Sequence, residues 1–146
     1  MAIHQISVFL ENRAGQLAEI TALLFQNNID LRAINIAETS DYGVLRLIAD
    51  DEEKACRVLN ENGFICSVSE VFVIGVPDRP GELSVILGYL AEAQIDIAYM
   101  YSVFGQQNGV AYMIFRVEDG EKFKAAMAAH HIALADTESF CLQNAE

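Results

Sequence analysis

The spacing of hydrophobic residues along the chain changes repeatedly between two periods, and each change marks an expected element. Stretches in which every second residue is apolar predict strands that are buried on one face. Stretches in which apolar residues recur after three or four positions predict amphipathic helices. The elements expected in the first half are a strand over Ile3–Leu10, a helix from Gly15 to Asn27-Asn28, hairpin strands over Ile29–Ala37 and Val44–Ala49, a helix capped by Asp50-Asp51 that ends at Asn62-Gly63, and a strand within Phe64–Val76.

The second half repeats this order, so one structural unit is used twice. Its expected elements are a helix over Gly81–Ala93, strands over Ile95–Phe104 and Gly109–Val117, a helix from Gly120 to Ala129, and strand-like sequence in Ile132–Leu142. The halves align with a shift of 66 residues (Gly15 to Gly81, 81 − 15), which is expected to hold without a gap as far as Ile48 and Ile114. The segment Ile65–Val76 is long for one strand. We expect it to hold the last strand of the first half and the first strand of the second, joined almost without a linker.

Each half therefore has the order β-α-β-β-α-β, which is typical of ferredoxin-like units. The expected fold class is α+β: two such units in tandem, with antiparallel sheets and helices on one face. The expected domains are residues 1–69 and 70–146. Halves of this size are close to the lower limit for an independent core, so we expect them to depend on each other or on a second copy of the chain, and we predict a homodimer.

Charge and composition narrow the class of partner. The net charge of −12 argues against nucleic acid and against an anionic membrane, because both need a positive surface. The hydrophobic content of 53% is slightly above that of an average soluble domain, which favours an apolar interface. The three cysteines, Cys56, Cys66 and Cys141, lack CxxC spacing and predict buried free thiols. No signal peptide or membrane-length apolar run is recognisable, so we expect a cytoplasmic protein.

A polar loop between the first strand and the first helix is repeated in both halves. The two copies are Asn12-Arg13-Ala14-Gly15-Gln16-Leu17 and Asp78-Arg79-Pro80-Gly81-Glu82-Leu83. A glycine at the start of a helix lets a ligand approach, and the free N–H groups there favour a carboxylate. The next strand of each half begins with Asp30 or Asp96, at the far end of the helix, where a carboxylate can serve a neighbouring loop.

These features predict a site for a small zwitterion, with its carboxylate on the helix N–H groups and its ammonium on an Asn or Asp side chain. The candidate ligand-binding residues are Asn12, Arg13, Ala14, Gly15, Gln16, Leu17, Asp30, Asp78, Arg79, Pro80, Gly81, Glu82, Leu83 and Asp96. An equally weighted alternative is that Asn12 and Asp78 only cap a helix, while Asp30 and Asp96 only form a turn. Arg13 and Arg79 either clamp a carboxylate or, more commonly, stay solvated or pair with nearby acids.

The chain offers no recognisable catalytic constellation. It has no Ser-His-Asp or Cys-His pairing and no GxxxxGK[ST] loop, so we expect no catalytic residues and no cofactor. Adjacent residues on a helix point about 100° apart, so His130 and His131 cannot share one metal ion, and no metal site is expected. Tyr101 either lines a pocket or is buried against the sheet, and burial is the favoured role.

The doubled loop resembles the DRPG-x-L or NRPG-x-L signature of the ACT domain, and Asn27-Asn28-Ile29-Asp30 and Ala93-Gln94-Ile95-Asp96 resemble its helix-to-strand ending. The resemblance covers nearly the whole chain as two consecutive ACT domains. It implies a β-α-β-β-α-β fold and an amino-acid ligand held at an interface between paired domains, as in the sensors of aspartate kinase and phosphoglycerate dehydrogenase. The positions that match the family's site are Asn12, Gly15, Asp30, Asp78, Gly81 and Asp96.

Two departures from the family pattern affect the first loop. Leu10 stands where the phosphoglycerate dehydrogenase pattern has a His, which argues against a serine site specific for a hydroxyl. Ala14 replaces the usual Pro, so the first loop is expected to be less rigid. The leading hypothesis is a stand-alone regulatory protein that binds a free amino acid. The alternative is a non-catalytic regulatory or interaction subunit that docks on a separate metabolic enzyme.

Overall fold

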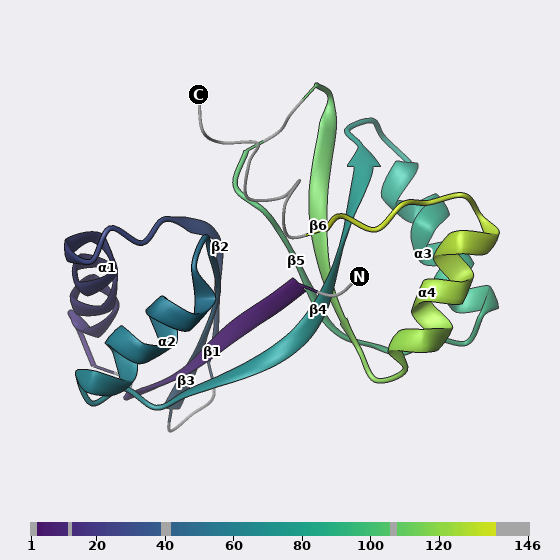
Figure 1. Cartoon of the computed structure of the whole chain (residues 1–146). Helices are drawn as coiled ribbons and strands as arrows, with labels where there is room; N and C mark the ends of the chain where they lie inside the picture. The colour runs from purple at the N-terminus through teal and green to yellow at the C-terminus, as the bar shows by residue number, and fades with distance from the viewer. Residues whose placement is uncertain (1–2, 12, 39–41, 106–107, 137–146) are drawn as a thin grey trace. The chain divides into compact units, whose positions relative to one another are not determined.

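The computed structural model describes residues 3–11, 13–38, 42–105 and 108–136 (Figure 1). The chain divides into two compact units, His4–Ser69 and Glu70–Glu146 together with Met1–Ile3. We call them the first unit and the second unit. None of the helices in the described ranges is long and apolar enough to cross a membrane.

The first unit has helices on one face of an antiparallel sheet (Figure 1). Its elements are β1 (Ile3–Glu11), α1 (Gln16–Gln26), β2 (Leu31–Glu38), β3 (Tyr42–Ala49), α2 (Glu52–Glu61) and the start of β4 (Cys66–Pro77). The strand order is β2-β3-β1, and the Phe9 N–H donates to the Ile65 carbonyl (3.1 Å), which places the residue before β4 beside β1. This is the ferredoxin-like arrangement expected from the element order.

The core of the first unit lies between its sheet and its two helices. Alternate residues of β1 and β3 point to the helix side because side chains on a strand alternate between faces. The residues that meet there include Ile6, Val8 and Leu10 of β1, Leu45 and Leu47 of β3, Ile20 and Leu24 of α1, and Val58 and Leu59 of α2. All of them are buried, so the period of the sequence correctly predicted the inward face of each element.

The second unit repeats the architecture with a more aromatic core (Figure 1). Its elements are the rest of β4, α3 (Glu82–Glu92), β5 (Ile97–Ser102), β6 (Val110–Val117) and α4 (Gly120–Ala129), with the strand order β4-β6-β5. The Phe123 ring of α4 stacks on Phe72 (4.9 Å between centroids) and lies 5.7 Å from the ring of Phe115. Burial of Tyr101, which is 8% exposed, confirms its expected role.

The α+β, ferredoxin-like fold class is therefore confirmed for both units. β4 runs as one strand of 12 residues across the boundary between Ser69 and Glu70, so the expectation that one segment serves both halves is also correct. The last expected strand, within Ile132–Leu142, is represented by an antiparallel bridge between Ile74 and Leu134. Its residues 137–142 lie outside the described ranges.

The two hairpins have different lengths, which corrects the gap-free alignment of the halves. Leu31 pairs with Ala49 in the first unit, and Ile97 pairs with Val117 in the second. The offset is therefore 66 residues between β2 and β5 (97 − 31) but 68 between β3 and β6 (117 − 49). The second hairpin has two more residues in its connection.

The predicted equivalence of Ile48 and Ile114 is consequently wrong. Ile48 pairs with Ala33, and the corresponding partner of Tyr99 in the second unit is Arg116, not Ile114. The error has a physical cause, because a shift by two residues leaves every side chain on the same face of a strand. The alternation of apolar residues therefore looks the same under either offset.

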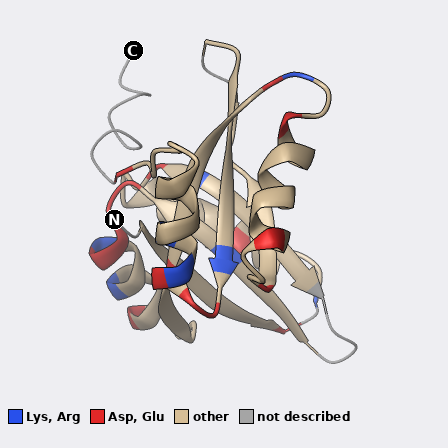
Figure 2. Ribbon diagram, turned by 90° about the vertical axis from the view of Figure 1, so that its right-hand side faces the viewer, with Lys and Arg blue, Asp and Glu red and all other residues tan. Residues whose placement is uncertain are grey.

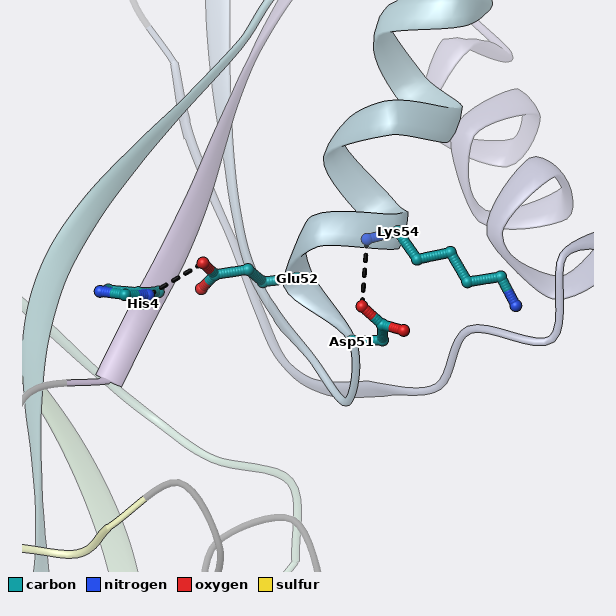
Figure 3. Close-up of polar contacts among 4 residues, drawn as sticks. All are labelled: His4, Asp51, Glu52 and Lys54. Atoms are coloured by element: carbon teal, nitrogen blue, oxygen red, sulfur yellow. Dashed lines mark hydrogen bonds and ion pairs between the residues drawn. The ribbon is translucent and has the colours of Figure 1, made fainter.

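Charged side chains are located mainly on the helices and connecting segments, and the strands carry few of them (Figure 2). A contact between His4 Nδ1 and Glu52 Oε1 (2.9 Å) joins β1 to the first turn of α2 (Figure 3). Next to it the Asp51 carboxylate accepts a hydrogen bond from the Lys54 N–H (3.0 Å), which confirms the predicted cap of this helix. Exposed ion pairs contribute little to stability, so the cap is the more useful of the two contacts.

The two described cysteines of the chain, Cys56 and Cys66, are free and half-buried, and Cys141 lies outside the described ranges. Burial, followed by the charge of Glu52, raises the pKa of the Cys56 thiol. Burial is also the main reason why the pKa of Cys66 is raised, to about 11, and its contact with Cys56 adds to the effect. Both thiols are therefore protonated and unreactive at neutral pH, as structural cysteines are.

Candidate functional site

Both repeated loops end in a glycine that starts a helix. Gly15 caps α1 with φ +86°, and Gly81 caps α3 with φ +91°, so both adopt the left-handed conformation that glycine favours. Neither helix has a hydrogen bond from a side-chain cap, and a Cβ added at either glycine would meet no atom within 4 Å. The positive end of the helix dipole thus lies beside an exposed glycine at both positions, which favours an anion there.

The cap residues differ from those considered in the sequence. The cap residue of α3 is Gly81, and the backbone N–H of Asp78 donates to the Gly109 carbonyl (2.8 Å). The cap of α1 is likewise Gly15. Asn12, the other residue considered as a cap, lies outside the described ranges. Pro80 and Gly81 are exposed in the second loop, as Ala14 and Gly15 are in the first.

A hollow of about 160 Å³ lies beside the start of α1, inside the first unit. One part of its wall is apolar and another part is polar, as is usual in sites for small molecules. The lining residues are Leu10, Glu11, Arg13, Gln16, Leu17 and Ile36, with Gly43. Gly43 lies directly opposite Leu10 in the pairing of β1 and β3, and the missing side chain at this position leaves room for the hollow.

Gln16 is the most unusual residue of this hollow. It is only 7% exposed, and no hydrogen-bond donor of the described residues reaches its buried Oε1 atom. A buried acceptor without a donor costs about 1–3 kcal/mol, so folded proteins rarely keep one without a reason. Gln16 also lines the hollow, but its Oε1 atom is inaccessible to solvent, so a donor in the hollow reaches it only after the side chain moves.

The arginines of both loops pair with nearby acids, in agreement with the more common of the two roles considered for them. Arg13 Nε lies 3.4 Å from Glu11 Oε2, and its Nη2 lies 3.7 Å from Glu19 Oε2. Arg79 Nη2 lies 2.8 Å from Glu82 Oε1, and the Glu82 N–H donates to the Arg79 carbonyl (3.3 Å). The contact of Arg79 is shorter than either contact of Arg13, and both arginine side chains are largely exposed.

Asp30 lies at the opposite end of α1, where it organises the helix-to-strand turn. Its Oδ2 lies 3.0 Å from Arg32 Nη1, its N–H donates to Asp50 Oδ1 (3.0 Å), and the Asp50 N–H donates to its carbonyl (3.0 Å). A helix of 11 residues is about 16 Å long, so Asp30 and Gly15 of one unit cannot contact the same small ligand. Asp96, the matching residue of the second unit, is exposed.

The structure adds residues that the sequence did not mark as part of the site. Leu10 had been noted as a strand residue and for departing from a family pattern, and Glu11, Ile36 and Gly43 had not been considered as site residues. The alternation of β1 is a signal for Leu10, because it places this residue on the helix side. Ile36 and Gly43 line the hollow together with Leu10 only because of the register in which the hairpin strands pair. The alternation of apolar residues alone does not determine that register.

Comparisons with known proteins confirm the resemblance seen in the loops. A family model described as an ACT domain pair matches residues 1–141. The crystal structure of a protein from Bacteroides thetaiotaomicron is 35% identical over 97% of both chains, with a TM-score of 0.90. The ligand-free regulatory subunit of aspartate kinase from Thermus thermophilus has a similar fold, with 16% identity over 88% of this chain and 90% of that chain and a TM-score of 0.63. No curated protein matches the sequence.

Proposed function

Because the chain belongs to the ACT domain family as an ACT domain pair, we propose that it is a non-catalytic regulatory protein that binds a free amino acid at an interface between ACT domains. One observation carries this proposal above the others. The glycine-capped start of α1 adjoins a small hollow whose wall is partly apolar and partly polar. A helix start that favours an anion beside such a hollow fits the carboxylate and the side chain of an α-amino acid.

In the proposed complex the ligand carboxylate accepts hydrogen bonds from the first-turn N–H groups of a helix that starts at Gly15 or Gly81. The other residues of the two loops, Asn12 to Leu17 and Asp78 to Leu83, surround the ligand. Asp30 and Asp96 contribute from a neighbouring ACT domain, since within the first unit Asp30 lies at the far end of α1. The chain is proposed to act as a cytoplasmic homodimer.

Regulation follows if the ligand binds one arrangement of the protein better than another. A ligand shifts the equilibrium between two arrangements of the domains only by the difference between its affinities for them. A ligand that binds across an interface contacts both domains, so its affinity depends directly on their arrangement. No metal ion or cofactor has a part in this proposal.

We expect one amino acid, or a small group of similar ones, to raise the melting temperature of the protein in a thermal-shift screen of all twenty. A ligand that binds only the folded state stabilises it by about 2.7 kcal/mol at a concentration of 100 times its Kd. For a chain of this size that corresponds to a shift of roughly 5–10 °C. A screen in which none of the twenty changes the melting temperature would contradict the proposal.

A second candidate function is that of a regulatory subunit that docks on a separate metabolic enzyme. The observation in its favour is the similarity in fold and length to the aspartate kinase regulatory subunit of Thermus thermophilus, which covers 90% of that chain. Exposed apolar side chains such as Phe9 and Tyr42 offer contact area for a partner. A stable heteromeric complex purified from native extract, without amino-acid binding by the isolated chain, would favour this function over the first.

A further inference from the structure

The sheet of the first unit carries an exposed row of apolar residues on the face opposite its helices (Figure 1). We infer that this row is the surface through which two copies of the chain form a dimer, related by a two-fold axis that runs along the row. The homodimer is part of the proposed function, on which this inference rests, and the row specifies the face that the two copies share.

The row crosses the sheet from one strand to the next. Phe9 of β1 pairs directly with Val44 of β3, and Val44 pairs with Ala37 of β2. On the other side of β1, the Phe9 N–H donates to the carbonyl of Ile65 (3.1 Å), just before β4. Paired residues of neighbouring strands have their side chains on the same face of a sheet. We call Ile65, Phe9, Val44 and Ala37 the apolar row.

The row lies on the open face because the sequence neighbours of its residues point toward the helices. The residues next to Phe9 and Ile65 all pack in or against the core of the first unit: Val8, Leu10, Phe64 and Cys66. Side chains alternate along an extended chain, so Phe9 and Ile65 point away from that core. Phe9 is 46% exposed and Ile65 is 69% exposed.

Tyr42 extends the row by a second aromatic side chain. It lies two residues from Val44 on β3, on the same face, and is 48% exposed. A whole aromatic side chain offers about 150–250 Å² for burial, so Phe9 and Tyr42 together leave about 200 Å² exposed. With Ile65 the apolar area is on the order of 300 Å², the size of a patch that is often functional. Such a patch suits the apolar centre of an interface that is completed by a polar rim.

The second unit differs at the corresponding place. Gly75 pairs with Tyr112 there, as Phe9 pairs with Val44 in the first unit. A Cβ added at Gly75 would lie 3.5 Å from Tyr112 Cε1, so the half-buried tyrosine packs beside the glycine on its own sheet. The fold therefore does not need an exposed Phe at this position, which favours a role of Phe9 in association.

The charges beside the row identify a second copy as the partner. Glu11 lies two residues beyond Phe9 on β1. Arg46 lies two residues beyond Val44 on β3, on the opposite side of the row, because the two strands are antiparallel. A two-fold axis along the row exchanges the two sides, so Glu11 and Tyr42 of each copy face the partner's Arg46. The contact occurs twice, as in an isologous interface, and a guanidinium is attracted by both a carboxylate and an aromatic ring.

Both charged side chains also have neighbours within the unit. Glu11 Oε2 lies 3.4 Å from Arg13 Nε, and Arg46 Nη1 donates to Asn35 Oδ1 (3.4 Å). The Glu11 side chain is nevertheless 82% exposed, so a second base can approach it. A guanidinium has five N–H donors, so Arg46 can keep its contact with Asn35 and also receive a carboxylate of the partner.

The overall charge of the chain supports the choice of this face. Two copies that each carry a net charge of −12 repel each other, so association is favoured where the charges are balanced. Among the described strand residues of the row and of the two rows beside it, the charged ones are one acid, Glu11, and one base, Arg46.

The test is sedimentation velocity of the full-length protein at several concentrations, for wild type and two matched variants. We expect wild type to sediment with twice the mass of the 16.1-kDa chain. Phe9→Glu places a carboxylate in the centre of the row, opposite the same carboxylate of the partner. It is expected to raise the dissociation constant of the dimer at least about a hundredfold, because a central aromatic anchor is lost in both copies. Phe25→Glu changes an exposed aromatic residue of α1 and should leave this constant within about twofold of wild type.

An exchange of charges tests the two-fold arrangement. Glu11→Arg and Arg46→Glu each bring like charges together across the interface and are expected to weaken the dimer roughly tenfold. The double variant restores opposite charges and should return to within about threefold of wild type. Within one chain the two residues lie about 14 Å apart along the strands, so this rescue reports a contact between copies.

Circular dichroism checks that each variant is folded, as expected for side chains that point away from the core. A dimer that persists in Phe9→Glu, dissociation caused by Phe25→Glu, or no rescue in the double variant would overturn the inference and leave amino-acid binding by the chain standing. A wild type that stays monomeric would overturn both the inference and the proposed homodimer. So would a monomer that binds a separate enzyme in native extract and loses this binding in Phe9→Glu. Amino-acid binding itself is judged separately by the thermal-shift screen.

Discussion

Replacement of Phe115 by alanine is expected to lower the free energy of unfolding by roughly 3–5 kcal/mol. Phe115 is fully buried on the inner face of β6, where its ring lies 5.7 Å from that of Phe123. Phe123 in turn stacks on Phe72, so the substitution leaves a cavity beside an aromatic pair and removes favourable ring contacts as well as apolar area. Urea unfolding followed by circular dichroism measures the effect through the shift of the midpoint.

Phe25 provides the control for this experiment because it is 82% exposed on α1. Phe25→Ala is expected to change the free energy of unfolding by no more than about 0.5 kcal/mol. A loss below 1 kcal/mol for Phe115→Ala would mean that the second unit is not packed around this ring.

Replacement of Leu47 by alanine is expected to cost about 2–5 kcal/mol, as is typical for buried leucines. Leu47 is fully buried on β3 and lies between Ile6 of β1 and Ile34 of β2 in the sheet of the first unit. With the offset of 68 residues it is the counterpart of Phe115 (115 − 47), so the two substitutions test equivalent positions of the two cores.

The volume-conserving variant Leu47→Met separates packing from other effects. It is expected to cost less than about 1.5 kcal/mol in the same urea experiment, because methionine fills nearly the same space. Equal losses for Leu47→Met and Leu47→Ala would indicate that something other than the cavity determines stability at this position.

The architecture could be predicted from the sequence because local rules and the global fold agree along most of the chain. The alternation in β1 marked Ile6, Val8 and Leu10 as inward-facing, and they are buried in the core. The cap of α2 was visible because Asp51 precedes a run of good helix formers, and its carboxylate does accept from the Lys54 N–H. The fusion of two strands into β4 followed from a run of apolar residues too long for one half.

The relation between the two hairpins could not be obtained in the same way. A strand that is shifted by two residues keeps the same apolar face. The alternation of apolar residues therefore does not reveal the two-residue insertion that changes the offset between the two halves from 66 to 68. Only the pairing of Leu31 with Ala49 and of Ile97 with Val117 reveals it. The correction matters for function, because it makes Ala111 the counterpart of Gly43.

The candidate binding site was predictable as a loop but not as a cavity. The doubled Arg-x-Gly sequence identified the helix starts, since a glycine in this place permits a left-handed cap and an open first turn. The burial of Gln16 depends on how α1 packs over Leu10 and the hairpin, which is a tertiary property. The sequence thus gave Gln16 and Glu82 equal weight, whereas their surroundings differ.

We claim above all that a glycine-capped helix start receives the carboxylate of an amino acid. A crystal structure of the protein grown with an amino acid that raises its melting temperature tests this claim most directly. We predict a ligand carboxylate oxygen within about 2.7–3.2 Å of a backbone nitrogen in the first turn of α1 or α3. A ligand bound away from α1 and α3, or an α1 start covered by protein in the complex, would contradict the claim.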